Sequence, residues 1–239
     1  MRLVTVTLWL LAGAALTGGV YWSFLITPES TGWSLAASAL LLITAAFLLA
    51  LTISGAAVGW RQGVSTSHIR TAVAGVPGIV PAALIAALFW WLADSVTDLM
   101  TLYSGNIKAW FIASFGWDDV AWLFTGVGWL AAWLKWVVGP VLALSLLGAI
   151  LSQGWRGLAS VTWITRALAP LPLVTATLLF AALVAAPWIY LTPWRPEDLP
   201  PTSVELAFVI AKLAVTALLM AIGVALIVRQ TTAHKHQST

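Results

Sequence analysis

The sequence predicts an all-α membrane protein with six transmembrane helices, and three observations carry this prediction. Hydrophobic residues make up 61% of the 239 positions and charged residues only 8%, whereas soluble domains carry about 25% charged residues. Several uninterrupted apolar stretches reach the roughly 20 residues that a helix needs to cross a bilayer. These stretches are continuous rather than alternating, which favours helices over a barrel of strands. We therefore expect a single transmembrane domain over residues 1–239.

Each span has its own sequence signature. The first resembles a signal peptide at its start, but its apolar character continues to Ile26, which favours a retained helix. The fourth is too long for an upright span, and Pro140 near its centre predicts a kink. Between the third and fourth spans, residues 105–119 predict a helix that lies on the membrane surface. The expected spans are residues 3–26, 34–58, 73–92, 121–152, 168–191 and 204–228.

The charged residues predict the orientation of these spans. One set of ends carries the basic residues Arg2, Arg61, Arg70, Arg156, Arg166, Arg229 and Lys235. The opposite ends carry all eight acids, together with Lys108 and Arg195. Because basic residues concentrate in cytoplasmic loops, both termini are expected in the cytoplasm and the surface helix on the periplasmic side. The chain has no cysteine, which fits a bacterial cytoplasmic (inner) membrane and excludes thiol chemistry.

A short aromatic and basic motif occurs twice, as GWRQG at residues 59–63 and GWRG at residues 154–157. With an offset of 95 residues, twelve of the thirty positions from 59 to 88 are identical, against about three expected by chance. This favours an internal repeat, with three tandem helical hairpins in one orientation, although shared alanine and leucine content is the alternative explanation.

The repeated motif has the composition of a membrane anchor. Tryptophan prefers the headgroup level and arginine pairs with lipid phosphate, so we expect these residues at one depth on the cytoplasmic side. A docking site for a partner is the alternative use of the same residue types. The expected anchor residues are Trp60, Arg61, Trp155, Arg156 and Arg229.

Two lysines lie within predicted spans, and they are the strongest candidates for a binding site. Lys135 and Lys212 both fall in the outer part of the membrane. On the sixth helix, Glu205, Lys212 and Thr216 share a face with Gly223. Such a face predicts a site for an anion or a lipid headgroup. The alternative is that both lysines are structural and extend their charge toward water.

Tryptophans and glycines mark further surfaces. Trp129, Trp133 and Trp136 share a face of the fourth helix with Trp122. This stripe could bind a flat ligand, or it could face lipid or another subunit. Gly55 and Gly59 lie four residues apart, which predicts close helix packing.

The predicted spans contain no Asp, Glu or His in their middle, and no nucleophile with a matching base is evident. We therefore expect neither an enzyme, a metal site nor a cofactor. The leading hypothesis is a non-catalytic integral membrane subunit or scaffold of a larger inner-membrane assembly. Its expected partners are the lipid bilayer and other membrane subunits or further copies of itself, with no nucleic acid. The alternative is a small transporter or channel for an anion or an amphiphilic lipid substrate, built on the lysine-bearing face.

Overall fold

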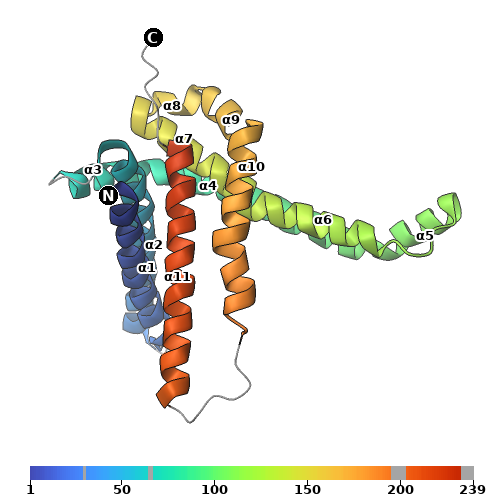
Figure 1. Ribbon diagram of the computed structural model, residues 1–239, viewed down its shortest axis with the longest axis horizontal. Coiled ribbons are helices and arrows are strands. Elements are labelled where there is room, and N and C mark those ends of the chain that lie inside the picture. The colour runs from blue at the N-terminus through green and yellow to red at the C-terminus, as the bar shows by residue number, and fades with distance from the viewer. Residues whose placement is uncertain (29–30, 64–66, 195–202, 233–239) are drawn as a thin grey trace.

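A computed structural model describes residues 1–28, 31–63, 67–194 and 203–232, and its regular structure in these ranges is entirely helical (Figure 1). The prediction of an all-α chain is confirmed. Six helical runs are long and apolar enough to cross a membrane, as the sequence predicts. They cover Arg2–Ile26, Gly32–Gln62, His68–Leu102, Ala121–Gln153, Pro170–Leu191 and Val204–Thr232.

Several of these runs consist of more than one helical element. The third run continues to Leu102, ten residues beyond its predicted end at residue 92. The elements in chain order are α1 (Arg2–Ile26), α2 (Gly32–Gln62), α3 (His68–Gly75), η1 (Val76–Gly78), α4 (Ile79–Leu102), α5 (Ser104–Phe115), α6 (Ala121–Trp133), η2 (Leu134–Val138), α7 (Gly139–Gln153), α8 (Arg156–Ala159), α9 (Thr162–Ala167), α10 (Pro170–Phe180), η3 (Ala181–Ala185), η4 (Pro187–Leu191) and α11 (Ser203–Thr232).

Proline explains where the helices widen into π-helical turns. The segment η2 lies directly before Pro140, and there the Gly139 N–H bonds to the carbonyl of Leu134, five residues back. Proline has no N–H to donate, so the normal four-residue hydrogen-bond pattern cannot continue through it. The π segments η3 and η4 flank and include Pro187 in the same way. The kink that Pro140 predicts therefore takes the form of a π-helical insertion.

The helix α7 lies at the centre of the fold. Its Leu146 and Leu147 are completely buried. One cluster of buried residues joins α7 to α1, α2, α4 and α11, and a second joins it to η2, α9, α10 and α11. Since α7 contributes to both clusters, it connects the N-terminal helices to the C-terminal ones.

The helices α1 and α2 pack against each other at very short range. A methyl group added at Gly55 would lie 2.4 Å from the Trp9 ring, and one added at Gly13 would lie 2.1 Å from the Thr52 hydroxyl. The Trp9 indole N–H donates to the Thr52 carbonyl at 2.9 Å. Glycine at these positions leaves the space that the facing side chains occupy.

One pair of helices runs in a different direction from the others. The helices α1, α2, α10 and α11 share one direction, whereas α4 and α6 extend sideways from them, with α5 at their far end (Figure 1). The arrangement of the spans as three tandem hairpins in one orientation stays a prediction. The small residues Gly75 and Gly78 allow the start of this pair to cross α2 and α7 closely, because Ser54, Leu151 and Ile150 fill the space beside them.

The two copies of the repeated motif are not equivalent. In the first copy, Gly59 and Trp60 belong to α2, which continues to Gln62. In the second, Gly154 ends α7 with a φ of 62°, a left-handed value that favours glycine, and Trp155 lies outside the helix. A short helix nevertheless packs back on the preceding long one in both cases, α3 on α2 and α9 on α7.

The glycine contact between α1 and α2 gives a first prediction. We expect Gly55→Ala to lower the free energy of unfolding by about 1–3 kcal/mol, because the new methyl group displaces Trp9. Gly18→Ala is the control, since no atom lies within 4 Å of its added methyl group. Its effect should be neutral or stabilising by up to about 1 kcal/mol. Thermal unfolding in detergent measures both, and equal effects of the two variants would contradict the packing.

Candidate functional site

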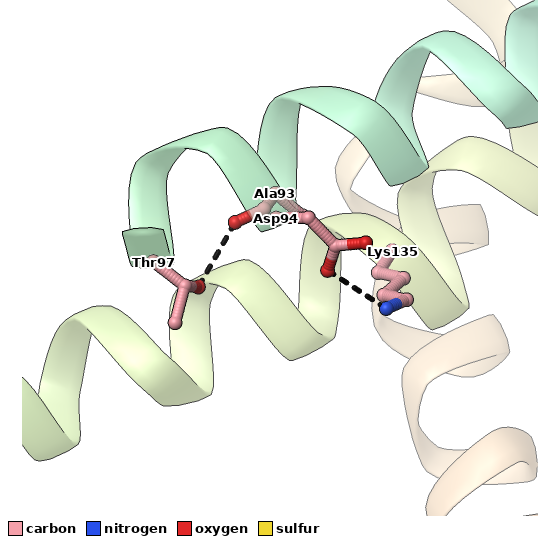
Figure 2. Close-up of polar contacts among 4 residues, drawn as sticks. All are labelled: Ala93, Asp94, Thr97 and Lys135. Carbon is pink, nitrogen blue, oxygen red and sulfur yellow. Dashed lines mark hydrogen bonds and ion pairs between the residues drawn. The ribbon is translucent and has the colours of Figure 1, made fainter. Parts of the chain in front are cut away.

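Lys135 pairs with a carboxylate between two helical runs. Its Nζ lies 2.8 Å from Oδ1 of Asp94, the one salt bridge among the described residues (Figure 2). The ammonium also lies 3.8 Å from the ring centroid of Trp90 and 6.0 Å from that of Trp136. The two indoles meet edge to face at 4.7 Å. The charge of Lys135 is therefore held by one carboxylate and two aromatic faces.

The sequence alone does not identify the partner of Lys135. Its hydropathy predicts that the third span ends at residue 92, whereas α4 continues to Leu102 and includes Asp94. The signal was the spacing of Trp90 and Asp94, four residues apart on one face. One turn further along α4, the Thr97 hydroxyl donates a hydrogen bond to the Ala93 carbonyl of the same helix at 2.9 Å (Figure 2).

Lys212 binds free backbone carbonyls at the end of the fifth helical run. Its Nζ donates to the carbonyls of Thr192 at 2.8 Å and Trp194 at 3.1 Å, just after η4. The last carbonyls of a helix lack internal partners and carry partial negative charge, which a lysine ammonium satisfies. A shallow groove of about 200 Å³ lies beside it, lined by Leu191, Trp194, Phe208, Ala211, Lys212 and Val215.

The face of α11 that contains Lys212 packs against the fifth run. The Thr216 hydroxyl is buried and donates to the Lys212 carbonyl at 2.9 Å. A methyl group at Gly223 would lie 2.9 Å from Cβ of Leu183 in η3. Glu205, half-buried near the start of α11, completes the expected set. The structure thus brings most of this face into contact with neighbouring protein.

The tryptophans of the fourth run do not form one surface. Trp129 is 73% exposed, whereas the Trp133 indole N–H donates to the Thr177 hydroxyl on α10 at 3.0 Å. Trp136 instead contacts Trp90 on α4. Trp122 joins an aromatic cluster with Phe111 and Trp117 at the far end of the helix pair. Trp136 lies within the π segment η2, whose wider turns shift it relative to the three tryptophans of α6.

Trp60 lies inside the protein rather than at its surface. It is 7% exposed, and its indole N–H donates to the Ala225 carbonyl on α11 at 2.7 Å. Trp155 is 59% exposed, as an interfacial anchor would be, and Arg156 is exposed beside it. The anchor hypothesis thus fits the exposure of the second motif, while the first motif has an internal packing role that the sequence did not indicate.

Two arginines contact Trp60, and a third follows it in the chain. The Arg2 guanidinium donates to its carbonyl at 3.3 Å, and the Arg229 guanidinium carbon lies 5.4 Å from its ring centroid. The neighbouring Arg61 donates to the Gly148 carbonyl on α7 at 3.3 Å. Trp60 and Arg229 therefore lie at the same end of α2 and α11, while the common membrane depth of Trp60, Trp155 and Arg229 stays a prediction.

His68 is also buried at this end. It is 4% exposed, and its ring meets that of Trp9 edge to face at 4.9 Å. Among the described residues, the Gly63 backbone lies beside this ring, but neither ring nitrogen makes a hydrogen bond of regular geometry. The other two histidines, His234 and His236, lie outside the described residues. Within the described part of the chain, no group of three His, Asp or Glu side chains could hold a metal ion.

The Lys135 contact gives a second prediction. Asp94→Asn should lower the free energy of unfolding, because it leaves the ammonium without its carboxylate. A double-mutant cycle with Lys135→Met should give a coupling of up to about 1 kcal/mol, since Asp94 is 52% exposed and partly screened. Asp98→Asn, one turn away on α4, is the control. A coupling of zero would show that the pair does not hold the helices together.

The ionisable side chains of the spans are thus used mainly for internal contacts. Lys135 bonds to Asp94 and Lys212 to two carbonyls, and neither extends into a deep cavity. No protein-family model matches the chain, and comparisons with curated proteins and with solved structures each found no significant match.

Proposed function

We propose that the protein is a non-catalytic integral membrane subunit or scaffold of a larger assembly. The observation that carries this proposal is the helix pair α4 and α6 with the terminal α5, called the arm below (Figure 1). The arm extends away from the other helices, and α5 has no buried residue. An apolar arm that leaves the direction of the other spans favours a neighbouring protein as its packing partner.

The exposed area supports the same proposal. The chain exposes 14967 Å² of surface. A compact folded chain of 25.4 kDa would expose about 10,000 Å². The difference of about 5,000 Å² exceeds the roughly 1,000–2,500 Å² that one subunit contributes to an obligate interface. Lipid covers part of this surface, and the rest is enough for a partner.

The contacts of the two lysines favour a scaffold over a transporter. A substrate path would need a charge that is available to the substrate. Lys135 is held by Asp94, and Lys212 is held by the carbonyls of Thr192 and Trp194. Their charges therefore contribute to holding helices together.

We place the protein in a bacterial cytoplasmic membrane, with three hairpins and both termini in the cytoplasm. The charges support this arrangement. Arg2 and Arg229 contact Trp60, and Arg61 follows it in the chain, so three basic residues lie at one end of the helices α1, α2 and α11. The acids Asp118 and Asp119 follow α5 at the far end of the arm. On this proposal α5 lies at the periplasmic surface, where its tryptophan-rich sequence suits the lipid interface.

A small transporter or channel for an anion or an amphiphile is the alternative, and one observation favours it. Lys135 lies in the π segment η2, and π-helical turns occur frequently at functional sites. A pair such as Lys135 and Asp94 inside an apolar helical run also suggests function by default.

The mass of the native particle tests the leading proposal. After mild solubilisation, we expect a particle heavier than one chain with its detergent. Trp129→Ala on α6 should reduce this mass, because it removes the most exposed indole of the arm. Trp33→Ala is the matched control, since Trp33 is 88% exposed on α2 outside the arm. A particle of one chain in gently prepared extracts would contradict the subunit role and leave the transporter as the better hypothesis.

A further inference from the structure

Two guanidinium groups from different helices contact Trp60, and a third arginine follows Trp60 directly in the chain. Arg2 comes from the start of α1, Arg61 from the last turn of α2, and Arg229 from the last turns of α11. Arg2 and Arg229 contact Trp60 itself, on its carbonyl and its ring. The hydrogen bond from the Trp60 indole to Ala225 fixes α2 against α11 and so keeps this group together. These residues form what we call the arginine junction.

All contacts of the arginine junction within the described chain are to neutral groups. Two of the guanidiniums bond to backbone carbonyls, and the third lies over an indole. One carbonyl uses only one of the five N–H donors of an arginine. The five described acids lie on other parts of the fold, in α4, after α5 and near the start of α11, and they are Asp94, Asp98, Asp118, Asp119 and Glu205. Among the described residues, these three arginines therefore have unused donors and no carboxylate partner.

We propose that the arginine junction binds the phosphate groups of an anionic phospholipid. The planar guanidinium fork matches phosphate oxygens in paired hydrogen bonds, which makes arginine well suited to this ligand. The junction lies at the ends of three membrane-length helices, where headgroups are found, and basic pockets between such helices are known to hold anionic lipids.

The number of guanidiniums indicates which lipid binds most tightly. A lipid with one phosphodiester brings a single negative charge, which leaves most of the junction uncompensated. A lipid with two phosphate groups brings two charges that can pair with separate guanidiniums. The site should therefore prefer a diphosphate lipid over a monophosphate lipid at equal total charge. This preference is independent of whether the chain is a subunit or a transporter.

The test uses the full-length protein in phosphatidylcholine nanodiscs that contain either cardiolipin or phosphatidylglycerol at equal total charge. Retained lipids are counted by native mass spectrometry, and the thermal midpoint is followed. The main variant is Arg229→Gln, because Arg229 makes no hydrogen bond to a described residue that its loss would break. The control is Arg156→Gln, which removes the same charge from an exposed arginine after α7. Unfolding of both variants without anionic lipid shows that each is folded.

We expect the wild type to retain cardiolipin in preference to phosphatidylglycerol. Arg229→Gln should weaken this binding by about tenfold, the usual effect of one lost hydrogen bond to a charged group. Arg156→Gln should leave it within about twofold, and Arg229→Lys should restore it only in part, because lysine keeps the charge without the fork.

Three results would overturn the proposal. Equal retention of both lipids, or equal weakening by Arg229→Gln and Arg156→Gln, would indicate a diffuse positive field rather than a site. Equal stabilisation by inorganic phosphate in detergent would indicate a free anion as the ligand. Absence of retained anionic lipid from the folded wild type would show that the junction is not a lipid site, and would favour an acidic segment of a partner.

Discussion

The hydrogen bond from the Trp60 indole to the Ala225 carbonyl is the contact on which the arrangement of the long helices depends. It joins α2 to α11 through two residues that are 165 positions apart in the sequence. Ala225 and Trp60 belong to the buried cluster that also contains residues of α1, α4 and α7. Because an unpaired indole N–H buried here would cost about 1–3 kcal/mol, the bond stabilises the depth of the two helices relative to each other. Arg229 lies one turn beyond Ala225 on α11, and its guanidinium lies over the Trp60 ring.

Ionisable and polar groups elsewhere follow the same constraint. An apolar environment makes an isolated charge expensive, so each lysine of the spans is paired with groups that a neighbouring helical run supplies. A register change within one helical run and free carbonyls at the end of another make such pairing possible. Around Pro140, the π segment η2 presents Lys135 to Asp94, and after Pro187 the end of η4 receives Lys212. Helix irregularity and charge placement are therefore linked in both runs.

The helical class and the six apolar runs could be predicted from the sequence, because hydrophobic length alone determines them. The partner of Lys135 could not, since hydropathy ends the third span before Asp94, while the helix continues through it. The direction of the arm could not be predicted from the sequence either, because it follows from tertiary contacts such as the close approach of Gly75 and Gly78 to other helices. The two GWR copies have the same sequence, but Trp60 is buried and Trp155 is exposed. This difference in burial arises from tertiary packing.

A comparison of Trp60→Phe with Trp155→Phe in thermal unfolding tests the role of the contact between Trp60 and Ala225. Both changes keep an aromatic ring and remove the indole N–H. We predict that Trp60→Phe lowers the free energy of unfolding by about 1–3 kcal/mol, because the hydrogen bond to the Ala225 carbonyl is lost and the smaller ring leaves a void in a buried site. Trp155→Phe should change it by less than about 0.5 kcal/mol, since Trp155 is 59% exposed. Equal effects of the two substitutions would contradict a junction built on Trp60.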